Sequence, residues 1–445
     1  MKLWDKGYKI EQEIETFTVG KDRELDLFLA PWDVLGTMAH ITMLESVGLL
    51  EADELSLLKQ ELTSIYREAL EGRFEIPIGV EDVHSQVEQL LTERLGEVGK
   101  KVHSGRSRND QVLVDLKLYF LHSIQELVEL IRPLFQTLLE LSERYKDILL
   151  PGYTHFQVAM PSSFGLWFGA YAESLIDDVI MLQAAWKVAD QNPLGSAAGY
   201  GSSFPLNRSM TTKLLGFSTL SYNVVYAQMG RGKTEKLLAF ALSSIASSLN
   251  KLASDICLYM SQNFGFLTFP DELTTGSSIM PHKKNPDVFE LVRARSNRLQ
   301  ALPGEISQII SNLPSGYHRD LQLVKESLLP AIEDTKSCIR ITQHMLERII
   351  ISPSVLDDPR YIYLFSVEAV NREVLNGLPF REAYKKIGQQ IAEGKFHPSR
   401  EVAHTHEGSI GNLCLADIQA KMERQLAVFN FQRFEQAIEE LLASS

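Results

Sequence analysis

Cysteine is scarce in this sequence. The chain of 445 residues contains three cysteines, Cys257, Cys338 and Cys414, which lie far apart and form no CxxC pair. Neither a disulfide framework nor a cysteine-based zinc site is therefore indicated, and a reducing compartment, the cytoplasm, fits best. The most apolar long segment, 237–260, is interrupted by polar and charged residues, and the N-terminus lacks the apolar core of a signal peptide. We therefore expect neither export nor a membrane span.

Positive charge is also in the minority. The chain has 44 Lys and Arg residues against 57 Asp and Glu residues, which gives a net charge of -13. This balance disfavours nucleic acid as the main partner, although an acidic surface can still contain a cationic pocket for an anionic substrate. The sequence has no GxSxG elbow, no dinucleotide fingerprint and no Cys/His/Asp cluster with metal-ligand spacing. We therefore expect acid/base chemistry that needs no cofactor and no metal.

The apolar residues are spaced as in long helices. After residue 110 they recur every three or four positions, at Leu113, Leu116, Phe120, Ile124, Leu127, Ile131, Leu134, Leu138 and Leu141. Further long helices are expected at about 163–190, 234–260, 287–312 and 321–351. The sequence thus predicts an all-α protein with a central five-helix bundle domain at 106–352. Small helical domains are expected at 1–105 and 353–445.

Three polar loops lie at the ends of the expected helices. They are HSGRSRND (103–110), PGYTH (151–155) and GSSIMPHKKNPD (276–287). Together they supply Arg, Lys, Ser, Thr, Asn and His side chains, which suit a site for a dicarboxylate whose oxygens become more negative during a reaction. In the third loop we expect Asn285 to cap a helix whose first position is Pro286.

The third loop matches every fixed position of GSSxMPxKxNP, and the sequence resembles the fumarase/aspartase superfamily in this signature. HSGRSRNDQ, and PGYTH followed by Gln157 and Pro161, resemble the further signatures of the argininosuccinate lyase family. The resemblance implies a three-domain all-α subunit in a homotetramer with a twenty-helix core and active sites shared between subunits. It also implies cofactor-free elimination of argininosuccinate to arginine and fumarate, the last step of arginine biosynthesis.

The resemblance also implies roles for individual residues. Ser277 and His155 are the proton-transfer pair, with Glu290 orienting His155 and Lys283 stabilising the carboxylate of a carbanion. We favour Ser277 as the base, but the resemblance leaves open which of the two is base and which is acid. The substrate-binding residues implied are Arg108, Asn109, Thr154, Ser278, Asn285, Tyr317, Gln322 and Lys325. An ion pair at the surface or at an interface is the alternative role of Arg108.

Some positions depart from the family pattern. The segment FTVGKDRE differs in spacing, so Thr18 is only a guess for the substrate contact near the N-terminus. His282 stands where the family usually has Gln, and the segment 221–236 differs from the usual SERDF-like sequence. The contribution of this segment to the substrate pocket is therefore open.

Three rival functions remain. The segment 227–234, AQMGRGKT, meets a relaxed phosphate-loop pattern after the strand-like NVVY, but a phosphate loop needs a parallel sheet that this helical sequence does not predict. A structural protein that has lost catalysis is disfavoured because Ser277 and His155 are both present. Another lyase of the superfamily, acting for example on adenylosuccinate, is disfavoured by the HSGRSRND loop.

Overall fold

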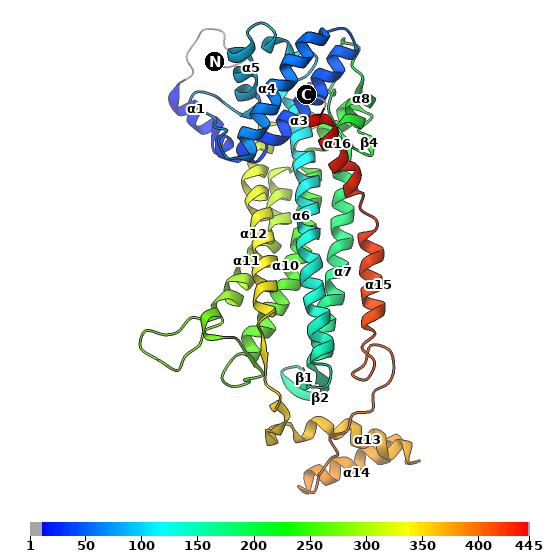
Figure 1. The fold of residues 1–445 in the computed structure, drawn as a ribbon. Coiled ribbons are helices and arrows are strands. Elements are labelled where there is room, and N and C mark those ends of the chain that lie inside the picture. Colours follow the sequence, from blue (N-terminus) through cyan, green and yellow to red (C-terminus); the bar gives the residue numbers. More distant parts are fainter. Residues whose placement is uncertain (1–10, 444–445) are drawn as a thin grey trace.

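Five long helices form a bundle in the middle of the molecule (Figure 1). The computed structural model describes residues 11–443. The bundle helices are α6 (Arg108–Arg144), α7 (Phe164–Ala189), α10 (Lys233–Tyr259), α11 (Asp287–Ile309) and α12 (Leu323–Leu346). They match the five helices that the apolar spacing predicts, with bounds that differ by a few residues. The all-α prediction is confirmed.

A capping box in the sequence sets the start of helix α6, the longest helix of the bundle. The Ser107 hydroxyl accepts a hydrogen bond from the Asn109 backbone N–H at 3.3 Å, and Asp110 Oδ1 accepts one from the Ser107 backbone N–H at 2.8 Å. This capping box satisfies backbone donors at the helix start. The 37 residues of α6 span about 55 Å at about 1.5 Å each, so its two ends lie far apart.

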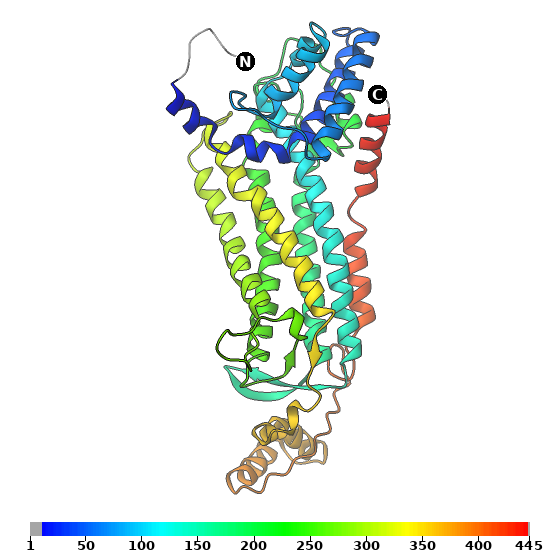
Figure 2. The same cartoon turned by 60° about the vertical axis from the view of Figure 1, so that its left-hand side comes forward.

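The N-terminal part of the chain covers the upper end of the bundle as drawn in Figures 1 and 2. It consists of α1 (Gln12–Val19), α2 (Asp22–Leu25), η1 (Asp26–Phe28), α3 (Ala30–Ser46), α4 (Ala52–Leu70), α5 (Val83–Leu95) and η2 (Gly99–His103). Helix α3 packs against α4, α5 and α6 and has buried residues on all sides, because it lies between the other N-terminal helices and the bundle. Two short helices are joined to the same end, α8 (Arg208–Leu214) and α9 (Val224–Met229).

Strands are few and short in the described part of the chain. Three two-stranded sheets pair β1 (Leu149–Thr154) with β2 (Gln157–Ser163), β3 (Gln191–Asn192) with β4 (Thr219–Leu220), and β5 (Leu267–Thr268) with β6 (Ile350–Ile351). The segment PGYTH, expected as a loop, therefore lies mostly in a strand. The NVVY segment, which is strand-like in sequence, instead begins helix α9. Asn223 Oδ1 caps this helix by accepting hydrogen bonds from the backbone N–H groups of Val225 and Tyr226. A phosphate loop after a strand is thus contradicted.

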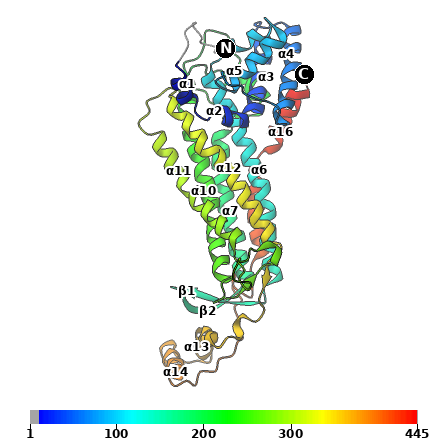
Figure 3. The same ribbon diagram turned by 90° about the vertical axis from the view of Figure 1, so that its left-hand side faces the viewer.

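The chain after residue 353 divides between two places. Helices α13 (Ser366–Leu375) and α14 (Phe380–Ala392) form a separate small core at the lower end, below the bundle in Figures 1 and 3. Helix α15 (Leu415–Leu426) then packs along α7, and α16 (Phe431–Ala443) packs on α3 and α8 at the upper end. The remaining 3-10 helices are η3 (Asp271–Leu273), η4 (Arg319–Gln322), η5 (Val355–Asp357) and η6 (Pro359–Phe365).

Helix α10 is apolar and long enough to cross a membrane, and the bent pair of segments Glu13–Phe28 and Ala30–Ser46 passes the same test. Half of the apolar stretch in α10 is buried in the protein, where α10 packs against α7, α11 and α12. This burial by neighbouring helices is what a core helix of a bundle shows.

Candidate active site

A cleft of about 180 Å³ lies at the upper end of the bundle, where the starts of α5, α6 and α12 meet. Five of the predicted substrate-binding residues line it, and they come from two distant segments of the chain: Arg108, Asn109, Tyr317, Gln322 and Lys325. The structure therefore brings together the residues of the first polar loop and those that follow α11. Thr154, Ser278 and Asn285 lie elsewhere, at the lower end.

Lys325 is buried in the wall of this cleft between two carboxylates. Its Nζ lies 2.8 Å from Asp22 Oδ1 and 2.5 Å from Asp26 Oδ1. Burial alone would lower the pKa of Lys325, but the charges of Asp26 and Asp22 raise it above the usual value, so the ammonium stays charged. Burial raises the pKa of Asp22 to about 6 against the opposing effect of Lys325. Lys325 thus stays positively charged, and its partner Asp22 has a pKa close to neutral pH.

Gln322 connects the cleft to the N-terminal helices. Its Nε2 donates hydrogen bonds to the backbone carbonyls of Thr18 and Val19, both at 3.1 Å. The Arg319 guanidinium donates to the same Thr18 carbonyl at 2.8 Å. The Thr18 hydroxyl donates to the Ile14 carbonyl within α1 at 2.8 Å. Thr18 therefore lies beside the predicted residue Gln322, although its hydroxyl is used within its own helix.

Arg108 makes ion pairs within its own chain. Its Nη1 lies 3.0 Å from Glu81 Oε2 and 3.1 Å from Asp82 Oδ2, and its Nη2 donates to the Ser85 hydroxyl. Arg108 therefore forms the ion pair that was expected as its alternative role, and it does so beside the cleft. Asn109, the next residue, lines the same cleft.

The acidic residues of the cleft wall were not predicted from the sequence. Asp22 and Asp26 lie four residues apart, and this spacing places two side chains on one helical face when the chain is helical. Asp82 and His84 belong to the segment EDVH, in which Asp82 caps α5 by accepting from the Ser85 backbone N–H at 2.8 Å. A cap signal followed by an apolar helix was therefore the available clue.

The second polar loop forms the tip of a β-hairpin at the lower end. His155 and Phe156 are the two turn residues between β1 and β2, with φ of 53° and 58°. Two consecutive residues with positive φ are typical of the type I′ turn that suits a two-residue hairpin. Non-glycine residues adopt this region at an energetic cost. Thr154, His155 and Phe156 are all exposed, and the Phe156 side chain is 84% exposed.

The third polar loop extends from the lower part of the bundle before α11 (Figure 1). The Asn285 backbone N–H donates to the Thr275 carbonyl at 2.8 Å, and Asn285 Nδ2 lies 3.3 Å from the Gly276 carbonyl. Asn285 therefore closes the base of the loop. The prediction that it caps α11 is wrong, because Pro286 occupies the N-cap and the Asn285 side chain is turned to the other side of the loop.

The catalytic candidates of this loop are accessible. The Ser277 hydroxyl accepts a hydrogen bond from the Met280 backbone N–H at 3.2 Å, which leaves its own proton free to be donated elsewhere. Ser278, Lys283 and Glu290 are exposed, and Glu290 lies in the first turn of α11. No hydrogen bond or ion pair joins His155 to Ser277 or to Glu290 in the described part of this single chain.

The two groups of site residues lie at opposite ends of the molecule. The cleft adjoins the start of α6 at the upper end, and the hairpin and the third loop adjoin the far end of the bundle (Figures 1 and 3). Because α6 spans about 55 Å, one chain cannot bring the two groups into contact with one small substrate.

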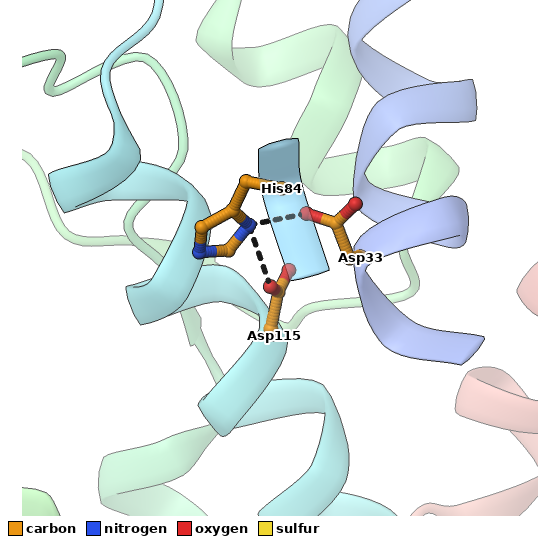
Figure 4. Close-up of side chains that lie close together, drawn as sticks. All are labelled: Asp33, His84 and Asp115. Carbon is orange, nitrogen blue, oxygen red and sulfur yellow. Dashed lines mark hydrogen bonds and ion pairs between the residues drawn. The ribbon is translucent and has the colours of Figure 1, made fainter. Parts of the chain in front are cut away.

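A buried group of three side chains adjoins the cleft (Figure 4). His84 Nδ1 lies 2.6 Å from Asp33 Oδ1 and 3.5 Å from Asp115 Oδ2. Within residues 11–443 this is the one group whose composition and spacing suit a metal ion. The 2.6 Å contact is a charge-assisted hydrogen bond, so His84 and Asp33 satisfy one another without an ion.

Comparison with known proteins identifies the family. A model of the lyase family matches residues 11–301. Argininosuccinate lyase from Parabacteroides distasonis is 62% identical over 441 residues, which cover 99% of each chain. Argininosuccinate lyase from Thermotoga neapolitana is 39% identical over 88% of this chain and 99% of its own. This chain belongs to the argininosuccinate lyase family. The resemblance predicted from the three polar loops is confirmed.

Solved structures of related enzymes have the same fold as this member of the argininosuccinate lyase family. An EDDS lyase variant with bound fumarate has a TM-score of 0.77 at 20% identity, covering 99% of this chain and 96% of its own. Class II fumarase from Schistosoma mansoni has a TM-score of 0.71 at 14% identity, covering 96% of this chain and 94% of its own. The fold class predicted from the sequence, a fumarase/aspartase-like helical subunit, is thereby confirmed.

Proposed function

We propose that this protein eliminates fumarate from argininosuccinate and releases arginine, and that it acts as a cytoplasmic homotetramer in arginine biosynthesis. The observation that carries the proposal is the identity of 62% with an argininosuccinate lyase over 99% of both chains. The cleft adds chemical support, because it combines the amide of Asn109 and the ammonium of Lys325 with carboxylates. Such a mixed set of charges suits a substrate that carries both carboxylates and cationic nitrogen groups.

The lower loops carry the groups that the chemistry needs. We assign Ser277 as the base that removes the proton from the carbon beside a substrate carboxylate, and His155 as the acid or its relay. The electron pair of the broken C–H bond first remains as a carbanion delocalised onto that carboxylate. It then forms the double bond of fumarate as the C–N bond breaks, and the leaving guanidino nitrogen takes up a proton from the acid. Lys283 stabilises the negative charge that the carbanion places on the carboxylate, and Glu290 orients His155.

The remaining candidates would hold substrate oxygens. Thr154, Ser278 and Asn285 lie at the lower end with the proton-transfer residues, and each offers a hydroxyl or amide donor. In the complete site these donors face the carboxylates of the succinate part. The residues of the upper cleft, which include Tyr317, Gln322 and Lys325, hold the remainder of the substrate.

A homotetramer would complete the site. In the proposed arrangement the cleft of one subunit receives the hairpin of a second subunit and the third loop of another. The separation between the two ends of the bundle supports this arrangement, because a single chain does not form one continuous site. A shared site also explains why the loops that bear Ser277 and His155 are exposed in the single chain.

The proposal is tested by a substrate panel. The purified protein is incubated with argininosuccinate, adenylosuccinate, malate and aspartate, and fumarate is followed by its ultraviolet absorbance. We expect fumarate from argininosuccinate alone. Release of fumarate from adenylosuccinate, or from none of the four, would contradict the proposed function.

A further inference from the structure

The buried group of Asp33, His84 and Asp115 connects three helices at the cleft. Asp33 belongs to α3, His84 to the first turn of α5, and Asp115 to α6. All three side chains are buried, with exposed fractions of 1% for each carboxyl and 5% for the imidazole. Because each side chain comes from a different helix, the group holds the imidazole ring in one orientation.

The two nitrogens of the His84 ring have different surroundings. Nδ1 points at Asp33 and Asp115, and Nε2 lies on the opposite edge of the ring (Figure 4). His84 also lines the cleft that contains Asn109 and Lys325. Within residues 11–443, no group hydrogen-bonds to Nε2. The ring therefore has one nitrogen held by the protein and one that is available to a ligand in the cleft.

The protonation of the group makes Nε2 a donor. Burial alone would lower the pKa of His84, but the charge of Asp33 and its hydrogen bond raise it above the usual value. Burial alone would raise the pKa of Asp33, but the charge and hydrogen bond of His84, with the charge of Arg106, lower it below the usual value. Burial and the nearby Asp33 charge raise the pKa of Asp115 well above the usual value. These shifts favour a protonated imidazole beside an ionised Asp33 and a protonated Asp115.

The neighbouring cations of the cleft already have partners. Lys325 pairs with Asp22 and Asp26, and Arg108 pairs with Glu81 and Asp82. The acidic residues of the wall are accordingly neutralised by the basic residues beside them. The imidazole of His84 pairs with Asp33 through Nδ1, whereas its Nε2 has no carboxylate partner within the described residues, and a substrate carboxylate is a chemical group that would accept a hydrogen bond from it.

We propose that His84 is a substrate-binding residue of this cleft, whose Nε2–H donates a hydrogen bond to a carboxylate oxygen of the substrate while Asp33 positions the ring through Nδ1. The proposal rests on the proposed function for the identity of the substrate. It assigns binding to His84 and leaves the proton transfers to Ser277 and His155. Asp33 is a positioning residue, because it acts through the imidazole.

Two variants of His84 separate its two nitrogens. The amide of Asn lies near the position of Nδ1, so His84→Asn keeps a donor to Asp33 and loses the donor to the cleft. The amide of Gln lies near the position of Nε2, so His84→Gln keeps the donor to the cleft and loses the bond to Asp33. We expect His84→Asn to raise KM by about tenfold to a hundredfold, the usual effect of losing a hydrogen bond to a charged group, and to change kcat much less. His84→Gln is expected to restore most of the affinity.

The experiment measures kcat and KM for argininosuccinate, with circular dichroism and sizing to establish that each variant folds and assembles. Calorimetric titration of argininosuccinate into the double variants with Ser277→Ala gives the affinity without turnover. An equal rise in KM for the two His84 variants, or a larger rise for His84→Gln, would overturn the substrate contact of Nε2 and would leave the proposed function standing. A wild-type protein that releases no fumarate from argininosuccinate would overturn the proposed function, and this contact with it.

Discussion

The upper cleft and the lower loops are built in opposite ways. In the cleft the charged groups are already paired within the chain, as the buried Lys325 is with Asp22 and Asp26. At the lower end His155 and Lys283 are exposed and Ser277 is half-buried, and the hairpin turn holds two non-glycine residues at positive φ. The cleft is thus organised by its own chain. The lower loops have donors and an apolar surface that their own chain does not use, which fits a contribution to a site on another subunit.

The comparison predicts different consequences of mutation at the two ends. Ser277→Ala removes the proposed base from an exposed loop, so we expect fumarate formation to fall by about 10²–10⁴-fold with folding and tetramer assembly unchanged. The measurement is the initial rate of fumarate release, with sizing and thermal unfolding. Ser56→Ala, on an exposed face of α4, is the matched control and should behave as wild type. Turnover close to wild type in Ser277→Ala would refute the role of this loop.

Lys325→Ala should affect activity and stability together. The substitution leaves the buried Asp26 and the half-buried Asp22 without their cation, and removal of one partner of a buried ion pair costs about 3–5 kcal/mol. Denaturant unfolding of Lys325→Ala and Ser277→Ala under the same conditions tests the contrast. If both variants unfolded at the wild-type denaturant concentration, the cleft would not be a structural unit of its own chain.

A smaller effect is expected from the pH dependence of Asp22. Its pKa of about 6 lies above the ordinary value of 3.8, so the folded protein binds this proton more readily than the unfolded chain. The contribution of Asp22 to stability is therefore greatest at low pH and is lost as pH rises from about 4 to about 6. The difference in Tm between Asp22→Asn and wild type should grow more positive over this range. A difference that does not change with pH would contradict the assignment, and Asp53→Asn, an exposed acid on α4, is the control.

Much of the fold could be predicted because it follows from local patterns. The apolar repeat defined the bundle helices, and the capping box of Ser107 and Asp110 marks the start of α6. The path of the chain after residue 353 was not visible in the sequence, since α15 and α16 pack on α7, α3 and α8 through contacts with distant residues. No local periodicity indicates such a return to the upper end of the bundle.

The candidate site was predictable to a different extent in its two parts. The polar loops have recognisable motifs, so their residues could be named from the sequence. Asp22, Asp26 and His84 were missed because their meaning depends on tertiary packing, which places them beside Lys325 and Asn109 in one cleft. Asn285 was given a capping role because the residue before a proline suits a helix cap, but its side chain closes the loop instead.

The central claim is that one active site takes its cleft and its proton-transfer loops from different subunits. Two inactive variants, Asn109→Ala at the cleft and His155→Asn at the hairpin, are unfolded, mixed in equal amounts and refolded into tetramers. If the two residues come from different subunits, about one quarter of the sites in a random mixture contain both intact residues, and about one quarter of the wild-type activity should return. Failure of the mixture to exceed either variant alone, with mixed tetramers demonstrated by sizing of differently tagged chains, would contradict the shared site.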